Sequence, residues 1–295
     1  MHKSSEKDII VFYHANCPDG FGAAWASWKH LGESAEYFPV HYNLPITQNI
    51  VGKKVYSVDF TFEGEQFPQV LREASSYTVI DHHVSNTERA KQATESVFDN
   101  THSGAMLVWK YFNPDVPVPK LLEYIEDNDL WKFTLPNSKE SAAAVAAHNF
   151  DFKTFDELQE IYENPEKFAR YLEGGKLILG KSGKDAGEIS DEHYFIEFEG
   201  RKIPVVNTPL HVSDIGHRMA TKYPPMAMMW CRRKNNITIS MRGDGSVDLS
   251  ALAAKYGGGG HHDAAGFLIP LVALNEPENL AKKELLVKLM STSQI

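Results

Sequence analysis

The stretch YTVIDHH, residues 77–83, joins a short apolar run to an aspartate and two histidines. An apolar run of this kind is typical of a buried strand, and here the strand ends directly at side chains that bind metals. The same pattern occurs twice more in the first third of the chain, where Asp8–Tyr13 precedes His14 and Lys54–Val58 precedes Asp59. These three strand ends dominate the interpretation of the sequence.

Helical patterns alternate with these strands, at Gly22–His30 and at Gly64–Glu73. Strands that alternate with helices predict a largely parallel sheet, which binds its ligands at the carboxyl ends of its strands. We therefore expect His14, Asp59 and Asp81 to lie along one edge of a single sheet.

The second half of the chain predicts a separate α/β unit. Residues 165–179 favour a long connecting helix that Gly174 and Gly175 interrupt, and short strands begin at about Tyr194 around a helix at Val212–Tyr223. The fold class is therefore α/β with two domains. The expected boundaries are a metal-binding catalytic domain at 1–163, a linker helix region at 164–193 and a substrate-binding domain at 194–295.

Composition restricts the class of protein. The 295 residues are 42% hydrophobic and 23% charged, as in ordinary globular proteins. The net charge of −9 argues against a protein that coats long duplex nucleic acid, although a small anionic substrate remains compatible with it. The apolar stretches are too short to span a membrane, and Cys17 and Cys231 are too few for a disulfide framework. We expect a cytoplasmic protein.

Carboxylates and imidazoles without a set of thiolates favour Mn²⁺, with Mg²⁺ or Co²⁺ as alternatives, over a structural zinc site. The segment YIEDNDLW, residues 124–131, adds two aspartates at the end of an apolar helix. Asp127 is the expected further ligand, and Asp129 is the alternative, because the sequence does not show which carboxylate faces the site.

Five segments in this order resemble the DHH phosphoesterase superfamily. They are HANCPDGFGAA at 14–24, VDF at 58–60, DHH at 81–83, EDND at 126–129 and GGGGHHDAAGF at 257–267. The last is similar to the glycine-rich signature of the companion DHHA1 domain. The resemblance implies an N-terminal parallel-sheet DHH domain, a smaller C-terminal α/β DHHA1 domain, and an active site in the cleft between them.

The resemblance also implies a ligand set for two divalent cations. His14 and Asp19 would contribute to opposite metals, Asp81 would bridge both, and His83 would approach the phosphate or the leaving oxygen. The second metal would be held by Asp59, His82 and Asp127. Asn16 stands where many members carry an aspartate for the first metal, and the neighbouring Cys17 could compensate with a thiolate.

The glycine run has two interpretations. Residues without a Cβ let backbone N–H groups approach an anion closely, and they also form tight turns. The first interpretation predicts a substrate-binding set that consists of Arg242, Gly258, Gly259, Gly260 and His261.

The function expected is hydrolysis of phosphodiester bonds in short oligonucleotides or in linear or cyclic dinucleotides, by a water that two cations activate. Phosphomonoesterase or exopolyphosphatase activity is the alternative among enzymes. A nucleotide-binding sensor of low activity is a further alternative, because Asn16 removes a negative charge from the first metal site. The sequence also allows a homodimer.

Overall fold

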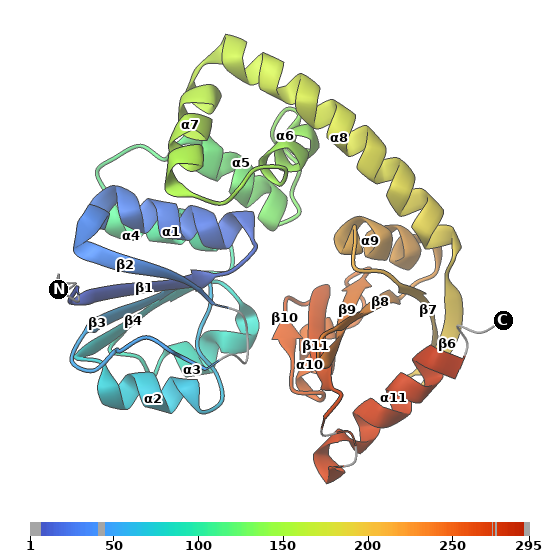
Figure 1. Cartoon of the computed structure of the whole chain (residues 1–295). Coiled ribbons are helices and arrows are strands. Elements are labelled where there is room, and N and C mark those ends of the chain that lie inside the picture. The colour runs from blue at the N-terminus through green and yellow to red at the C-terminus, as the bar shows by residue number, and fades with distance from the viewer. Residues whose placement is uncertain (1–6, 41–44, 273, 275, 292–295) are drawn as a thin grey trace. The chain divides into compact units, whose positions relative to one another are not determined.

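The computed structural model describes residues 7–40, 45–272, 274 and 276–291, and the chain forms two compact units, Met1–Leu179 and Gly180–Ile295 (Figure 1). The strands of the first unit are β1 (Ile9–His14), β2 (Ala35–Val40), β3 (Lys54–Val58), β4 (Ser76–Asp81) and β5 (Glu95–Phe98). Its helices are α1 (Pro18–Leu31), α2 (Gln66–Glu73), α3 (Thr87–Ala90), α4 (Gly104–Phe112), α5 (Lys120–Asp129), α6 (Ser138–Val145) and α7 (Phe152–Glu163). Helix α8 (Pro165–Asp191) continues from the first unit into the second.

The first sheet has the strand order β2-β1-β3-β4-β5, and all its neighbouring strands are parallel. Figure 1 shows α1 and α4 on one face of the sheet and α2 and α3 on the other. Successive residues of a strand point to opposite faces, so Val11 packs in the core on the α1 side while Ile10 and Phe12 pack in the core on the α2 side. Burial on both faces explains why these strands are apolar throughout.

The register of the sheet brings the predicted strand ends into line. Tyr13 pairs with Val58, and Val58 pairs with Ile80, so the residue that follows each of them emerges at the same edge. The predicted parallel sheet is therefore confirmed, and so are its three strands that end in metal-capable residues.

One expectation about the connecting helix is wrong. Gly174 and Gly175 do not interrupt α8, which runs without a break for 27 residues. A Cβ at Gly175 would lie 2.1 Å from the carbonyl oxygen of Glu140, so this glycine lets α8 pack closely against α6. The glycine is needed here because the two helices pack so closely that a side chain would not fit between them. The predicted domain boundaries at 163 and 194 remain a prediction.

The second unit contains a mixed sheet with the order β10-β11-β9-β8-β7-β6, in which β7 and β8 are parallel and the other pairs antiparallel. Helix α9 and the end of α8 pack on one face, and α10 and α11 on the other. The predicted α/β class is confirmed. Its strands are β6 (Tyr194–Phe198), β7 (Arg201–Asn207), β8 (Met226–Arg233), β9 (Asn236–Gly243), β10 (Gly259–Gly260) and β11 (Ala264–Pro270), and its helices are α9 (Val212–Lys222), α10 (Leu249–Ala254) and α11 (Leu280–Ser291).

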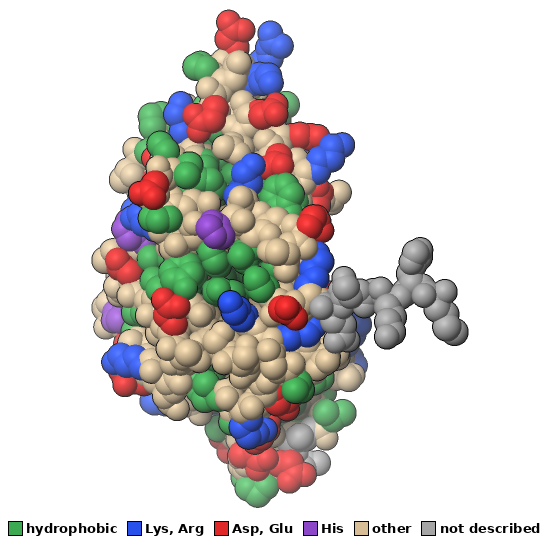
Figure 2. All heavy atoms as spheres, turned by 90° about the vertical axis from the view of Figure 1, so that its left-hand side faces the viewer, with side chains coloured by type: hydrophobic (Ala, Val, Ile, Leu, Met, Phe, Trp, Pro, Cys, Tyr) green, Lys and Arg blue, Asp and Glu red, His purple; other side chains and the backbone are tan. Residues whose placement is uncertain are grey.

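Among the described residues, no helix combines the length and the apolar character that a membrane crossing requires. Acidic and basic side chains are interspersed over the face shown in Figure 2. The expectation that the chain does not coat long duplex nucleic acid remains a prediction from the net charge of −9.

Candidate metal centre

In the described part of the first unit, three groups of side chains place their ligand atoms within 4.8 Å of one another. Asp59 belongs to two of these groups. Its Oδ2 lies 3.3 Å from Nδ1 of His14, and its Oδ1 lies 3.1 Å from Nε2 of His82. Asp59 therefore connects the groups at the carboxyl edge of the sheet. The groups are His14, Cys17 and Asp59; Asp19, His82 and Asp129; and Asp59, Asp81 and His83.

Asp59 occupies a strained position immediately after β3. Its φ of 62° lies in the left-handed region, which is unfavourable for a residue with a side chain and persists only where the surroundings hold it. Its backbone N–H donates to the carbonyl of Ile80 at 2.9 Å. A Cβ at Gly104 would lie 2.6 Å from Oδ1 of Asp59, so the close approach of α4 to this carboxylate requires a glycine.

Asp19 lies in the first turn of α1, and its carboxylate accepts hydrogen bonds from two backbone N–H groups at the start of α4. The N–H of Gly104 is 2.7 Å from Oδ2, and that of Ala105 is 2.9 Å from Oδ1. A helix N-terminus favours a negative charge, so α4 stabilises the ionised Asp19. Burial, together with the charges of Asp59 and Asp129, nevertheless raises the pKa of Asp19 well above its usual range.

His82 contacts carboxylates from three segments. Its Nε2 lies 3.1 Å from Asp59, 3.7 Å from Asp19 and 3.7 Å from Asp129. Burial alone would lower the pKa of His82, but these carboxylates raise it to about 10. A proton on His82 therefore balances the carboxylates, and a divalent cation could take over that role.

Asp81 ends β4 and is fully buried, but its carboxylate is saturated. Oδ2 accepts from Oγ1 of Thr61 at 2.7 Å and from Nδ2 of Asn86 at 2.8 Å. Oδ1 accepts from the backbone N–H groups of His82 and His83 at 2.8 and 3.1 Å. Burial would raise the pKa of Asp81, but His83 and these hydrogen bonds lower it to about 2.

His83 is oriented by Asp81, because its Nδ1 lies 2.8 Å from Oδ1 of that residue. A carboxylate only accepts, so Nδ1 carries a proton. Burial would lower the pKa of His83, but the charge of Asp81 and this hydrogen bond raise it. Asp81 thus holds His83 and the chain after β4 in place. Asp81 and Asp59 both belong to the ligand group with His83, and the bridging role that the resemblance implied for Asp81 remains a prediction.

The two aspartates at the end of α5 lie on different sides of the helix. Residues two apart in an α-helix are rotated by about 200°, so Asp127 and Asp129 cannot face the same site. Asp127 accepts hydrogen bonds from the backbone N–H and Oγ1 of Thr134, at 2.9 and 2.6 Å, and from the N–H of Leu135 at 3.2 Å. Asp129 joins Asp19 and His82. The structure therefore places Asp129, and not Asp127, beside other candidate ligands, and the choice of ligand remains a prediction.

The turn between β1 and α1 separates Asn16 from the candidate centre. Asn16 is exposed, has a φ of 57°, and belongs to none of the ligand groups among the described residues. Cys17 instead lies with His14 and Asp59. Burial and the nearby charges of Asp59, Asp129 and Asp19 raise the pKa of the Cys17 thiol well above its usual range, so the thiol is neutral when no cation is present.

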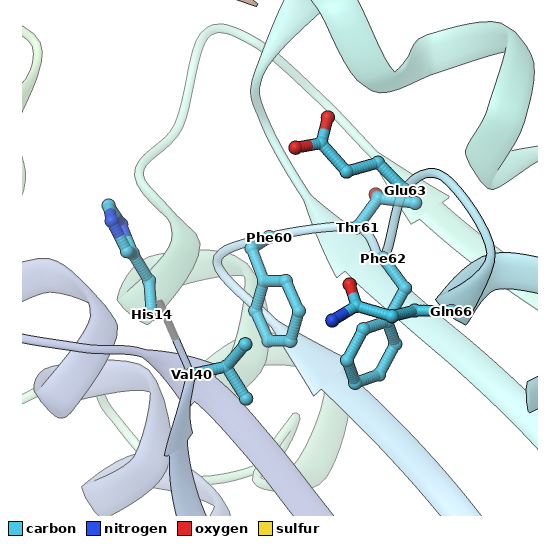
Figure 3. A pocket seen from close by; sticks show the side chains of 7 residues that line it. All are labelled: His14, Val40, Phe60, Thr61, Phe62, Glu63 and Gln66. Carbon is cyan, nitrogen blue, oxygen red and sulfur yellow. The ribbon is translucent and has the colours of Figure 1, made fainter. Parts of the chain in front are cut away.

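A small hollow adjoins His14 on the α2 side of the sheet edge (Figure 3). The rings of Phe60 and Phe62 and the side chain of Val40 form its apolar part, and Glu63 provides a carboxylate at its rim. The hollow thus places an apolar surface next to a candidate metal ligand.

The predicted substrate-binding residues lie in the second unit. Gly258 and Gly260 are required by packing, since a Cβ would lie 2.1 Å from the carbonyl oxygen of Gly266 or 2.6 Å from that of Ala264. The glycine run therefore forms the tight β10–β11 hairpin. Gly259 pairs with Gly266 in that hairpin, and the N–H of His261 donates to Ala264 at 2.9 Å.

Arg242 pairs with Ala264 across β9 and β11, so it lies next to the same hairpin. Its guanidinium donates to Oγ of Ser213 at 2.9 Å and to its neighbouring carbonyl, that of Met241, at 2.8 Å. Burial lowers the pKa of Arg242. Phosphate binding by Arg242 and by the hairpin remains a prediction.

The donor set in the first unit fits divalent cations. Oδ2 of Asp129 is a buried oxygen that accepts no hydrogen bond from any described residue, and the polar group that contacts Oδ1 of Asp59 is Nε2 of His82, at 3.1 Å. Buried carboxylate oxygens normally have partners, and a cation would supply the missing interaction. Imidazole and carboxylate ligands together suit Mn²⁺, Fe²⁺, Co²⁺ or Zn²⁺.

No family model matches the chain. The uncharacterized protein R106 of Acanthamoeba polyphaga mimivirus is 28% identical to it, over 87% of this chain and 66% of the relative. The chain thus spans about two thirds of the length of that relative.

A solved structure of the DHH domain of a protein from a family of ribosomal proteins covers 96% of this chain and 87% of its own, with a TM-score of 0.63 and 14% identity. The chain has the DHH fold. The resemblance that the five motifs indicated is confirmed at the level of the fold. The exonuclease RecJ bound to manganese is also similar, with a TM-score of 0.48 and 12% identity over 96% of this chain and 90% of its own.

Within the DHH fold of this chain, the first unit brings together most of the predicted ligands and leaves out Asn16 and Asp127. Sequence reasoning missed the roles of Thr61, Asn86 and Gly104, which position Asp81 and Asp59. The sequence could have indicated Gly104, since a small residue at the start of a helix permits another segment to approach closely. It could not have indicated Thr61 and Asn86, because a hydrogen bond between distant segments leaves no local sequence pattern.

Proposed function

We propose that the chain is a divalent-metal-dependent phosphoesterase that hydrolyses phosphodiester bonds in short oligonucleotides or dinucleotides. The observation that carries the proposal is the position of Asp59, which belongs to two ligand groups at the carboxyl edge of a parallel sheet. Ligands bind at this edge in sheets of this type. The motif resemblance supports the phosphoesterase class.

The proposed ligands divide between two cations. His14 and Asp59 would hold one, and Asp19, His82 and Asp129 the other, with Asp59 shared. When bound, the cations would lower the pKa of a water and neutralise charge on the phosphate oxygens. Mn²⁺ remains the cation expected for the Asp19, His82 and Asp129 group, since that group offers only nitrogen and oxygen.

The residues around the ligands have defined tasks in this proposal. Asp81 keeps a proton on Nδ1 of His83 and so orients the imidazole, which would approach the substrate phosphate or the leaving oxygen. Gly104 and the start of α4 hold Asp59 and Asp19 in position. In the second unit, Arg242 and His261 would contact the substrate phosphate.

Turnover assays on protein dialysed against a chelator and reloaded with Mn²⁺ or Co²⁺ test this function. The substrates are a linear dinucleotide, a short oligonucleotide, a nitrophenyl phosphate and inorganic polyphosphate. We expect nucleoside monophosphate as the main product, and activity that returns only with the cation. Release of inorganic phosphate in excess would favour the phosphomonoesterase or exopolyphosphatase alternative.

Asp151→Asn is a matched control, because Asp151 is an exposed carboxylate of the same unit that caps α7 by accepting the N–H of Thr154 at 2.9 Å. It should retain full activity. A wild-type protein that binds divalent cations and dinucleotide without turnover would support the sensor alternative. A protein that binds no divalent cation would contradict the proposal.

A further inference from the structure

Cys17 immediately precedes α1, at a position where a side chain commonly caps the helix, but its side chain makes no capping hydrogen bond. Its backbone is extended, with φ −126° and ψ 133°. The sulfur lies within 4.8 Å of a ring nitrogen of His14 and a carboxylate oxygen of Asp59. The thiol is therefore directed at two candidate ligands.

The surroundings of Cys17 differ from those of a cysteine that only fills a core. Cys231, the other cysteine of the chain, lies in β8 with 8% of its surface exposed, and it is part of the apolar interior of the second unit. Cys17 is instead half-buried beside the charges of Asp19, Asp59 and Asp129. Carboxylates are poor packing partners for a thiol, whereas a bound cation can be held by a thiolate, an imidazole and a carboxylate together.

We propose, on the basis of the proposed function, that Cys17 is a sulfur ligand of the cation held by His14 and Asp59. On binding, the S–H bond of Cys17 breaks, the proton passes to solvent, and a sulfur–cation bond forms. No oxidation or reduction accompanies this step. Cys17 thus completes the ligand group in the place that the sequence suggested for Asn16, which is exposed.

The proposal makes the two cation sites chemically unlike. A thiolate is a soft ligand that favours Fe²⁺, Co²⁺ or Zn²⁺ over Mg²⁺ or Mn²⁺. The group that consists of Asp19, His82 and Asp129 has no sulfur and retains a preference for harder cations. The protein should therefore prefer a mixed pair of cations, with the softer one beside Cys17.

Cobalt titration of the full chain tests the proposal, because a Co²⁺–thiolate bond gives a charge-transfer band in the near ultraviolet. Wild type and Cys231→Ser should both show this band and bind two Co²⁺ per chain. Cys17→Ser should lose the band, retain the cation at the Asp19 group, and bind the other Co²⁺ at least about tenfold more weakly. The affinity for Mn²⁺ should change less than that for Co²⁺.

A second measurement uses the unmodified protein, so it does not depend on how a variant folds. Alkylation of Cys17, located by peptide mass spectrometry, should be slowed by Co²⁺ or Zn²⁺ and little affected by Mg²⁺, while the labelling of Cys231 is unchanged. Two bound Co²⁺ without a charge-transfer band, or equal alkylation with and without Co²⁺, would overturn the assignment of Cys17 and leave the proposed metal centre intact. A wild-type protein that binds no Co²⁺ would overturn both.

Discussion

Strands β3 and β4 are both followed or ended by an aspartate, but the surroundings of the two aspartates differ. Each strand delivers an aspartate to the same edge of the sheet, and both side chains are buried, with exposures of 1% for Asp59 and 0% for Asp81. The carboxylate of Asp81 accepts hydrogen bonds from Thr61, Asn86 and the backbone after β4. The carboxylate of Asp59 instead has imidazoles as its polar neighbours among the described residues, with Nδ1 of His14 at 3.3 Å and Nε2 of His82 at 3.1 Å.

Burial therefore does not distinguish a candidate ligand from a structural carboxylate. The number of hydrogen bonds that the carboxylate accepts from the protein does distinguish them. A saturated carboxylate fixes the chain around it, because removing it would leave several buried donors unsatisfied. A carboxylate whose only polar neighbours are imidazoles can instead exchange a proton held on them for a cation. Asp81 belongs to the first kind and Asp59 to the second.

The largest effect is expected for Asp59→Asn. This substitution removes the shared carboxylate, so cation content should fall and kcat/KM should drop by at least about a thousandfold. The free energy of unfolding in EDTA should also fall, because burial would raise the pKa of Asp59 but His14 and His82 lower it well below its usual range, so its charge stabilises the fold. Metal analysis, turnover and urea unfolding measure the three quantities. Full cation content in this variant would contradict the shared role.

Asp81→Asn should affect stability more than it affects cation binding. We expect the free energy of unfolding in EDTA to fall by about 2 kcal/mol, because an amide cannot satisfy all the donors that surround Asp81. Cation binding should weaken without being lost, since the proposed ligands Asp59 and His82 remain. Loss of all cation with unchanged stability would instead make Asp81 the bridging ligand.

The pH dependence of this difference gives an internal check. The pKa of Asp81 is lowered to about 2 in the folded protein, below the value of about 3.9 for an unfolded aspartate. Its charge therefore stabilises the fold above about pH 4, and this contribution is lost as the pH falls toward 2. The stability difference between wild type and Asp81→Asn should shrink over that interval.

The smallest effects are expected at the end of α5, where the same contrast recurs within three residues. Asp127→Asn should lower the free energy of unfolding by about 1 kcal/mol, through weaker bonds to Thr134 and Leu135, and leave cation binding unchanged. Asp129→Asn should weaken cation binding by at least about tenfold and leave the stability in EDTA unchanged or raised. The opposite assignment of effects would return the ligand role to Asp127.

Much of the fold could be predicted from the sequence because its determinants are local. Apolar runs identified β1, β3 and β4, and their alternation with helices predicted the parallel sheet and the edge at which His14, Asp59 and Asp81 end. Gly175 misled the prediction for α8. A glycine that permits close packing against another helix looks the same in sequence as one that ends a helix.

The position of the candidate site at the ends of the strands could be predicted from the sequence. The role of each residue in the site was less predictable. The motifs placed Asp19 and His82 in the ligand set, but the choice between Asp127 and Asp129 depends on where a helix ends and which side faces the sheet. The position of Cys17, and not Asn16, beside His14 and Asp59 depends on a left-handed residue in the turn after β1. These are angular properties of the backbone, and residue types alone leave them open.

The contact between Asp19 and the first N–H groups of α4 bears on whether the protein folds before or after it binds cations. A helix N-terminus carries the equivalent of about half a positive charge, and here it faces a cluster of carboxylates. Part of the repulsion within that cluster is therefore offset by the chain itself and by the proton on His82. The polypeptide should reach its folded state before any ion arrives, unlike a zinc finger, which folds only around its ion. We therefore expect the protein to show a cooperative unfolding transition in EDTA, which would show that it folds before it binds cations.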